Sequence, residues 1–260
     1  MKKIRFTHAA DRKTKKMSSK SFISAETGSG RTGLSLAAPQ RKAFTLAEVL
    51  ITLVIIGVIG ALTVPSLIQN TRKQEYVSAL QKAYSTLSQA SNMIISEEGS
   101  PKCSDGGWAC SAEDIYSMYK KYLINAKECG KDSGCMYTGM YKRLNGNNFF
   151  ELDADSSIQK LVFADGMQAY FQFWSEDCSY NDESGEKDVC GGINVDINGA
   201  KSPNQFGRDI FTFMIKENGL LPRGCSNPSY DSCNPNGDNI FAYTGYGCAC
   251  KVLTEKAMNY

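Results

Sequence analysis

One carboxylate, Glu48, lies inside a long apolar run, where an ionisable side chain calls for a chemical explanation. No charged residue occurs between Val49 and Ile68, and the basic pair Arg41 and Lys42 comes just before the run. A charged side chain at membrane depth costs on the order of 2.5 to 3.5 kcal/mol, so such a residue is by default functional. The chemistry open to Glu48 is pairing with a cation that lies at a similar depth.

Ten cysteines form a second set of residues with chemistry of their own, and all of them follow Ser100. They are Cys103, Cys110, Cys129, Cys135, Cys178, Cys190, Cys225, Cys233, Cys248 and Cys250. The basic residues before the apolar run predict that the cysteines lie outside the cytoplasm, where an even number indicates disulfides. Zinc is the rival interpretation, but the sequence has no C-x-x-C spacing and its only histidine is His8.

The sequence leaves the connectivity of these disulfides open. Three neighbouring pairs each close a short loop rich in Gly, Ser or Asp, and we expect these neighbours to bond. They are Cys103 with Cys110, Cys129 with Cys135, and Cys178 with Cys190. Cys248 and Cys250 are too close to bond each other comfortably, so we expect them to reach back to Cys225 and Cys233.

A third candidate is the Gly- and Pro-containing stretch 196–209, which brings Asp196, Asn198, Asn204 and Asp209 into one loop. Carboxylate and amide oxygens are the ligands that Ca²⁺ takes, which makes calcium one interpretation, with Asp196, Asn198 and Asp209 as ligands. The loop is not an EF-hand, because no glutamate stands at the twelfth position. A structural turn held by Asn and Asp side chains is the interpretation we favour.

Catalytic motifs are absent from the sequence. It has no Gly-rich phosphate loop, no G-x-S-x-G and no H-E-x-x-H, and no histidine follows His8 to serve as a general base. Asp153, Asp155 and Asp165 could form a carboxylate pair, but turns in contact with solvent explain them better. We therefore expect no enzyme activity and no cofactor besides the calcium ion considered above.

Charge is distributed unevenly along the chain. Residues 1–43 contain eleven Lys and Arg against Asp11 and Glu26, a net charge of +9, whereas the remainder has 18 basic and 25 acidic residues, a net charge of −7. The first segment is rich in Lys, Ser and Gly without apolar periodicity, so we expect a disordered leader that starts at Met1 or Met17. The acidic remainder does not indicate nucleic-acid binding.

The apolar run positions Glu48, and its length suits a membrane-spanning helix. Residues 44–64 would extend roughly 30 Å as an α-helix, the thickness of a bilayer's hydrocarbon core. We expect a membrane helix over residues 44–65, a bend or local melting at Pro65, and an amphipathic continuation over residues 66–98. A secretory signal peptide is the alternative, but its apolar core would be shorter and followed by a better cleavage site.

The residues Arg41-Lys42-Ala43-Phe44-Thr45-Leu46-Ala47-Glu48 resemble the processing site of type IV pilins and of the pseudopilins of type II secretion. The resemblance implies a peptidase cut between Ala43 and Phe44, N-methylation of Phe44, and a role for Glu48 in assembly. It includes Pro65, where many members have a helix-bending proline, and extends weakly to about Glu98. At the position of Ala43 the family strongly prefers Gly.

Residues 99–260 are expected to form a cysteine-rich head. A short helix is predicted over residues 111–125, with Ser111 as its N-cap. Strands are predicted at residues 149–152, 161–164, 167–174, 192–197 and 210–215, with a hairpin turn at Asp165-Gly166. The expected fold class is α+β, a long N-terminal helix packed on an antiparallel sheet with disulfide-stapled loops, which the resemblance also implies.

Two functions follow from these expectations. The first is a structural subunit, a pilin or pseudopilin in a minor or specialised role, anchored in the inner membrane with its N-terminus in the cytoplasm and later part of an extracytoplasmic filament or the cell surface. Its partners would be a prepilin peptidase and methyltransferase, an inner-membrane assembly platform, membrane lipid before assembly, and other pilin or pseudopilin subunits. The second is a single-pass anchored binding or adhesion domain that does not polymerise. Whether the filament is a type IV pilus or a secretion pseudopilus is left open.

Overall fold

The computed structural model describes residues 44–181, 185–226 and 233–260. The expected leader, Ala43 included, lies outside this part of the chain. The chain divides into two units, Met1–Thr52 and Leu53–Tyr260. Apart from the first turns of the long helix, the whole described fold belongs to the second unit.

Helix α1 (Leu46–Glu98) is the longest described element, and its residues divide between two environments. None of its most apolar stretch is buried, and it is the one described helix long and apolar enough to cross a membrane. Leu53, Ile59 and Leu67, for example, are each more than half exposed. The later part buries a stripe of side chains, Val77, Leu80, Ala83, Leu87, Ala90, Ser91 and Ile94. The amphipathic continuation predicted from the sequence is therefore present.

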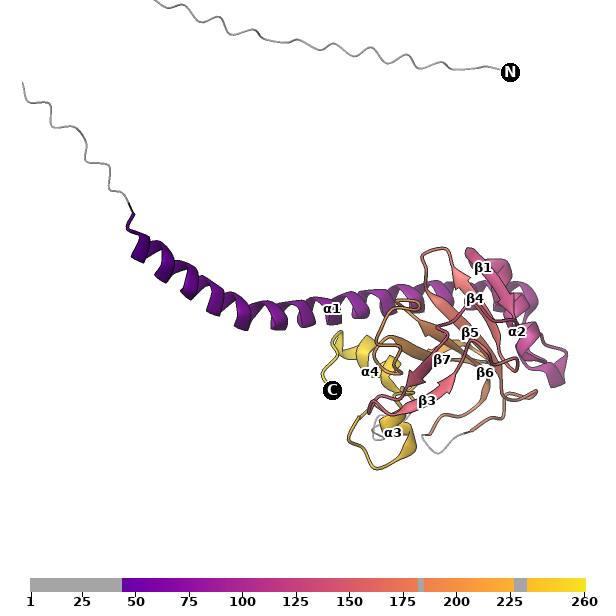
Figure 1. Ribbon diagram of the computed structural model, residues 1–260. Helices are drawn as coiled ribbons and strands as arrows, with labels where there is room; N and C mark the ends of the chain where they lie inside the picture. Colours follow the sequence, from indigo (N-terminus) through magenta and orange to yellow (C-terminus); the bar gives the residue numbers. More distant parts are fainter. Residues whose placement is uncertain (1–43, 182–184, 227–232) are drawn as a thin grey trace, which may run out of the picture. The chain divides into compact units, whose positions relative to one another are not determined.

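Proline and glycine act differently on this helix. Pro65 lies inside α1, which is unbroken on both sides of it, so the chain does not melt locally there. Figure 1 shows the helix curving gently along this part. Gly99 has a φ of +82°, which glycine adopts without steric cost, and α1 stops just before it, at Glu98, as expected.

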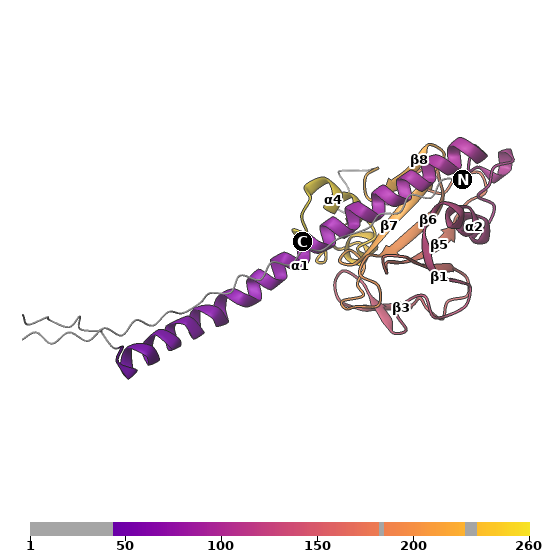
Figure 2. The same cartoon turned by 90° about the horizontal axis from the view of Figure 1, so that it is seen from above.

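An antiparallel sheet of six strands packs on the later part of α1 (Figures 1 and 2). Its strands are β1 (Asn125–Gly130), β4 (Gln159–Phe163), β5 (Gln168–Phe173), β6 (Val189–Asp196), β7 (Ile210–Lys216) and β8 (Gly219–Pro222), paired in that order. Two further strands, β2 (Met140–Lys142) and β3 (Asn148–Glu151), form a separate small sheet. The predicted α+β arrangement is confirmed.

The sequence predicted the central strands of this sheet and missed several elements around them. Strands β1, β2 and β8 and the helices α3 (Ile240–Thr244) and α4 (Cys248–Glu255) were not expected. The helix predicted over residues 111–125 is α2 (Ala112–Tyr122), and Ser111 caps it by accepting the N–H of Asp114 at 3.1 Å. It ends early because Asn125 already belongs to β1, where the chain pairs with β4.

The main core lies between α1 and the sheet. Leu80, Leu87 and Ile94 of α1 are fully buried. The ring of Tyr84 stacks on Phe213 of β7, with ring centroids 5.8 Å apart. A buried polar contact accompanies this packing, since the hydroxyl groups of Ser91 and Tyr119 lie 2.6 Å apart and join α1 to α2. The later part of α1 is thus a structural part of the head.

Five disulfides staple the head. They are Cys103–Cys110, Cys129–Cys135, Cys178–Cys190, Cys225–Cys250 and Cys233–Cys248. The three neighbour pairs are those expected, and the last two cysteines do reach back to Cys225 and Cys233. Both of these long-range bonds end on α4, so a short helix that propensity alone would not hold is fixed to the head at two points.

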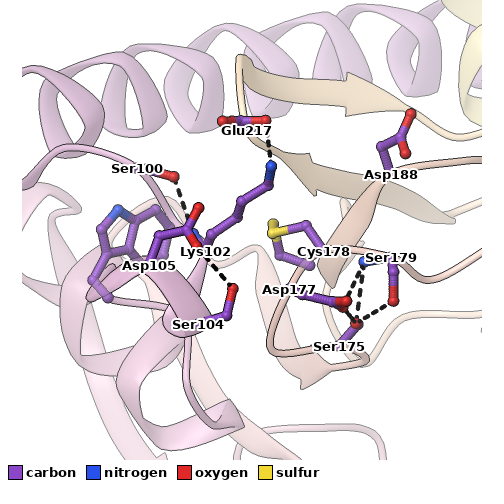
Figure 3. The surroundings of a disulfide bond; sticks show 12 residues. Ser100, Lys102, Ser104, Asp105, Ser175, Asp177, Cys178, Ser179, Asp188 and Glu217 are labelled. Atoms are coloured by element: carbon purple, nitrogen blue, oxygen red, sulfur yellow. Dashed lines mark hydrogen bonds and ion pairs between the residues drawn. A yellow bond between two sulfur atoms is a disulfide. The ribbon is translucent and has the colours of Figure 1, made fainter.

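The loops around the Cys178–Cys190 bond are tied down by charged contacts (Figure 3). Lys102 Nζ lies 3.0 Å from a carboxylate oxygen of Glu217 in the turn between β7 and β8. Hydrogen bonds donated by the hydroxyl of Ser175 and by groups of Ser179 lower the pKa of Asp177 to about 2. The Lys102–Glu217 pair joins the segment that follows α1 to the edge of the sheet at β8, and the contacts of Asp177 hold the loop between β5 and β6.

Candidate functional site

The first turn of α1 places Glu48 against Thr45. The backbone N–H and the hydroxyl of Thr45 both donate to one carboxylate oxygen of Glu48, each at 2.9 Å, and the N–H of Glu48 donates to Thr45 Oγ1 at 3.2 Å. This reciprocal arrangement is a capping box, in which Thr and a Glu three residues later satisfy N–H groups left unpaired at a helix start. Glu48 therefore has a local structural role.

The capping box was missed in the interpretation of the sequence, although Thr45-Leu46-Ala47-Glu48 has the T-x-x-E pattern that signals it. The other carboxylate oxygen of Glu48 accepts no hydrogen bond from the described residues and remains an acceptor for a further donor. Its neighbours are apolar and open to the surroundings, with Phe44 85% exposed. The turn therefore presents one charge on an otherwise apolar surface.

A family model, the prokaryotic N-terminal methylation motif, matches residues 39–64. The match contains Ala43, Phe44 and Glu48. The chain therefore carries an N-terminal motif of the pilin type. This motif supports processing by a prepilin peptidase, and together with the exposed apolar part of α1 it supports a membrane anchor. Comparisons of the chain with curated proteins and with solved structures gave no match.

The motif concerns only the N-terminal segment of the chain. Cleavage after Ala43, methylation of Phe44 and a role for Glu48 in assembly stay predictions, and Ala43 lies outside the described residues. The head carries its own candidate chemistry, which the motif does not address.

The loop between β6 and β7 brings two aspartates together at the end of the sheet. Asp196 ends β6, Asp209 immediately precedes β7, and both are fully buried. The Asp209 carboxylate accepts the N–H groups of Asn204 at 2.7 Å and Gln205 at 2.6 Å. One oxygen of Asp196 accepts the N–H of Asn198 at 3.3 Å. The structural turn favoured from the sequence is present, because both carboxylates hold loop backbone.

Burial determines how this pair ionises. Burial, and then the nearby Asp209 carboxylate, raises the pKa of Asp196 well above its ordinary value. Burial also raises the pKa of Asp209 to about 6, although the N–H groups of Gln205 and Asn204 act in the opposite direction. Two close buried carboxylates disfavour the doubly charged state. The pair therefore retains a proton at mildly acidic pH unless a cation takes its place.

The oxygen atoms around the pair fit calcium in donor type. The amide oxygens of Asn198 and Asn204 are buried and accept no hydrogen bond from the described residues. Two carboxylates and two amide oxygens are ligands that Ca²⁺ takes. Within the described part of the chain, no group of three or more His, Cys, Asp or Glu side chains is placed to hold a metal ion. Any calcium site would thus rest on two Asp and the Asn amides, and it stays a prediction.

The three other aspartates considered from the sequence each have a structural contact. The carboxylate of Asp153 accepts the N–H groups of Gly134, Cys135 and Met136 at 2.7 to 3.0 Å, which fixes the loop closed by the Cys129–Cys135 disulfide. Asp165 pairs with Lys82 of α1 at 2.8 Å. Asp155 accepts the N–H and hydroxyl of Ser157. Roles in holding loops account for these carboxylates.

Proposed function

We propose that this chain is a filament subunit, a pilin or pseudopilin in a minor or specialised role, which assembles through α1. One observation carries the proposal: a single continuous helix has a later part that belongs to the core of the head and an earlier part whose apolar side chains are exposed. Lipid covers these side chains in the membrane, and α1 helices of other subunits would cover them in a filament by close packing.

In this proposal Glu48 sets the register between subunits. Cleavage before Phe44 would free an amine four residues from Glu48, so the amine of one subunit and the carboxylate of its neighbour would lie at nearly the same depth. Pairing the two charges offsets part of the penalty that each bears in an apolar environment. The oxygen of Glu48 that the capping box leaves free supports this pairing.

The position and size of the head support the remaining parts of the proposal. Basic residues before α1 would keep the N-terminus in the cytoplasm and place the disulfide-bonded head outside it. Extraction from the bilayer would require an inner-membrane assembly platform. A large head with five disulfides favours a minor or specialised subunit over the bulk subunit of a filament.

Mass spectrometry of membranes and of filaments sheared from the cell surface tests the proposal. We expect a chain that begins at methylated Phe44 in both fractions, with far fewer copies in the filaments than the most abundant pilin-like protein. If the chain is detected in membranes alone, the proposal of a filament subunit is wrong, and a single-pass anchored binding domain is the better interpretation. A chain with its leader intact, or one that starts after Thr63, would contradict processing by a prepilin peptidase.

A further inference from the structure

Basic side chains gather where the apolar part of α1 ends. Arg72 and Lys73 follow the last residue of the apolar run, Ile68, by four and five positions. Arg208, in the loop between β6 and β7, lies beside them, and the three residues line one cavity of about 490 Å³. The remaining lining residues are Gln69, Tyr76, Ser202, Pro203, Gln205 and Met258. We call this cavity the exit pocket.

The positive charge of the exit pocket is not neutralised within the described chain. No described carboxylate forms an ion pair with Arg72, Lys73 or Arg208. Of the acidic residues close to these three in the sequence, Glu75 lines a neighbouring cavity, and Asp209 is buried and accepts backbone N–H groups. Because residues 44–260 carry a net charge of −7, a basic pocket does not reflect the general charge of the protein.

Hydrogen bonds fix the loop that forms one wall of the exit pocket. The side-chain amide of Asn198 donates to the hydroxyl of Tyr76 in α1 at 3.2 Å. The side-chain amide of Gln205 donates to the carbonyls of Arg143 and Leu144 at 2.9 and 2.8 Å. The loop is therefore held both to the helix and to the head, and Arg208 is positioned beside the first turns beyond the apolar run.

The pocket lies within reach of lipid headgroups. A helix rises 1.5 Å per residue, so the backbone of Arg72 and Lys73 lies about 6 to 8 Å beyond Ile68, the end of the apolar run, and about 10 to 12 Å beyond Pro65, the end of the expected membrane helix. The headgroup region of a bilayer is about 5 to 8 Å thick on each side of the hydrocarbon core, and long basic side chains extend back along a helix toward it. Guanidinium groups bind phosphate oxygens through paired hydrogen bonds, and basic residues next to a membrane span attract anionic lipids.

We propose that the exit pocket binds the phosphate headgroup of an anionic phospholipid in the membrane that holds α1. Arg72 and Arg208 pair with the phosphate oxygens, Lys73 adds a third positive charge, and the hydroxyl of Ser202 supplies a further donor. The bound lipid holds the underside of the head against the membrane surface. This binding rests on the membrane anchor alone and would be retained if the chain never entered a filament.

Native mass spectrometry of the full chain in detergent, titrated with phosphatidylglycerol or phosphatidylcholine, tests this site. We expect phosphatidylglycerol to bind at least tenfold more tightly than phosphatidylcholine. Each basic residue near an anionic surface contributes about a fivefold change in binding, so the double variant Arg72→Gln/Lys73→Gln should bind phosphatidylglycerol about 25-fold more weakly. Arg208→Gln, on a different element, should cause a loss of about fivefold.

The matched control is Lys131→Gln/Lys187→Gln, which removes the same charge from exposed positions outside the pocket and should bind lipid as the unaltered chain does. Equal losses in both double variants would show a general charge effect and overturn the site. Displacement of the lipid by inorganic phosphate at equal concentration would assign the pocket to free phosphate instead. A dimer that forms without lipid and disappears in Arg72→Gln/Lys73→Gln would assign it to a contact between subunits.

Discussion

Glu48 has two separable properties, a charge and a capping hydrogen bond, and substitutions can remove them one at a time. Glu48→Gln keeps a side chain suited to a capping box but has no charge, and Glu48→Ala lacks both. We expect both variants to insert into the membrane as the unaltered chain does. Because breaking a buried ion pair costs roughly 3 to 5 kcal/mol, we expect both to be absent from sheared filaments. Immunoblots of the membrane and sheared fractions measure both steps.

Thr45→Val provides the complementary variant, since it removes the hydroxyl of the capping box and leaves the charge. Loss of an N-cap costs about 1 kcal/mol, which a long helix in an apolar environment tolerates, so filaments should still contain this variant. Glu48→Gln in filaments at the normal level would show that the capping bond, and not the charge, is what assembly requires.

The buried pair Asp196 and Asp209 makes the stability of the head depend on pH. A carboxyl group with a raised pKa in the folded state stabilises the fold while it is protonated, and this stabilisation is lost as the pH rises from the unfolded pKa, near 4, through the folded one. For Asp209, with a pKa of about 6, the loss amounts to about 3 kcal/mol. Thermal unfolding of the full chain between pH 4 and pH 7.5 should show this decline.

Asp196→Asn should make this decline smaller without abolishing it, because it removes the raised pKa of Asp196 while burial still raises the pKa of Asp209. The control variant Asp165→Asn, which removes the charge paired with Lys82 and keeps an acceptor for the N–H of Met167, should leave it unchanged. If calcium binds the loop, millimolar Ca²⁺ at pH 7.5 should restore the lost stability in the unaltered chain and not in Asp196→Asn. Isothermal calorimetry without heat of binding would exclude calcium.

Helix α1 performs two tasks along its length, and matched substitutions should separate them. Leu87 is fully buried against the sheet, whereas Leu62 is 75% exposed. Leu87→Ala should lower the free energy of unfolding of the head by about 2 to 5 kcal/mol, measured by urea titration with tryptophan fluorescence. Leu62→Ala should leave that value unchanged. Equal effects would mean that the apolar part of α1 also supports the fold of the head.

The disulfides predict that the whole head lies in an oxidising compartment outside the cytoplasm. Such bonds form and persist in oxidising compartments and are rare in the cytoplasm. A maleimide reagent added to denatured protein from cell membranes should label none of the ten cysteines until a reductant is added, and then all ten. A variant without residues 1–65, which lacks the membrane helix and stays in the cytoplasm, is the control and should be labelled without reductant. Labelling of the membrane form without reductant would place its head on the cytoplasmic side.

Features with local signals were predictable from the sequence, and features that depend on distant partners were not. The stripe around Leu80 and Leu87, the stop at Gly99 and the cap at Ser111 are each encoded within a few neighbouring residues. Strand β1 was missed because it forms only where Lys127 and Glu128 pair with β4, and its own residues have little strand character. Likewise, the exit pocket joins Arg72 and Arg208, 136 positions apart in the sequence.

The two edge strands of the sheet determine whether neighbouring copies of the head can aggregate by strand pairing. An exposed strand edge invites backbone pairing with another chain, and bulges, charged residues and proline suppress it. Strand β1 has two register irregularities and carries Lys127 and Glu128, and β8 is only four residues long and ends at Pro222. The edge strands of neighbouring heads would therefore not pair into a continuous, amyloid-like sheet. Each head would remain a separately folded domain even at high local concentration.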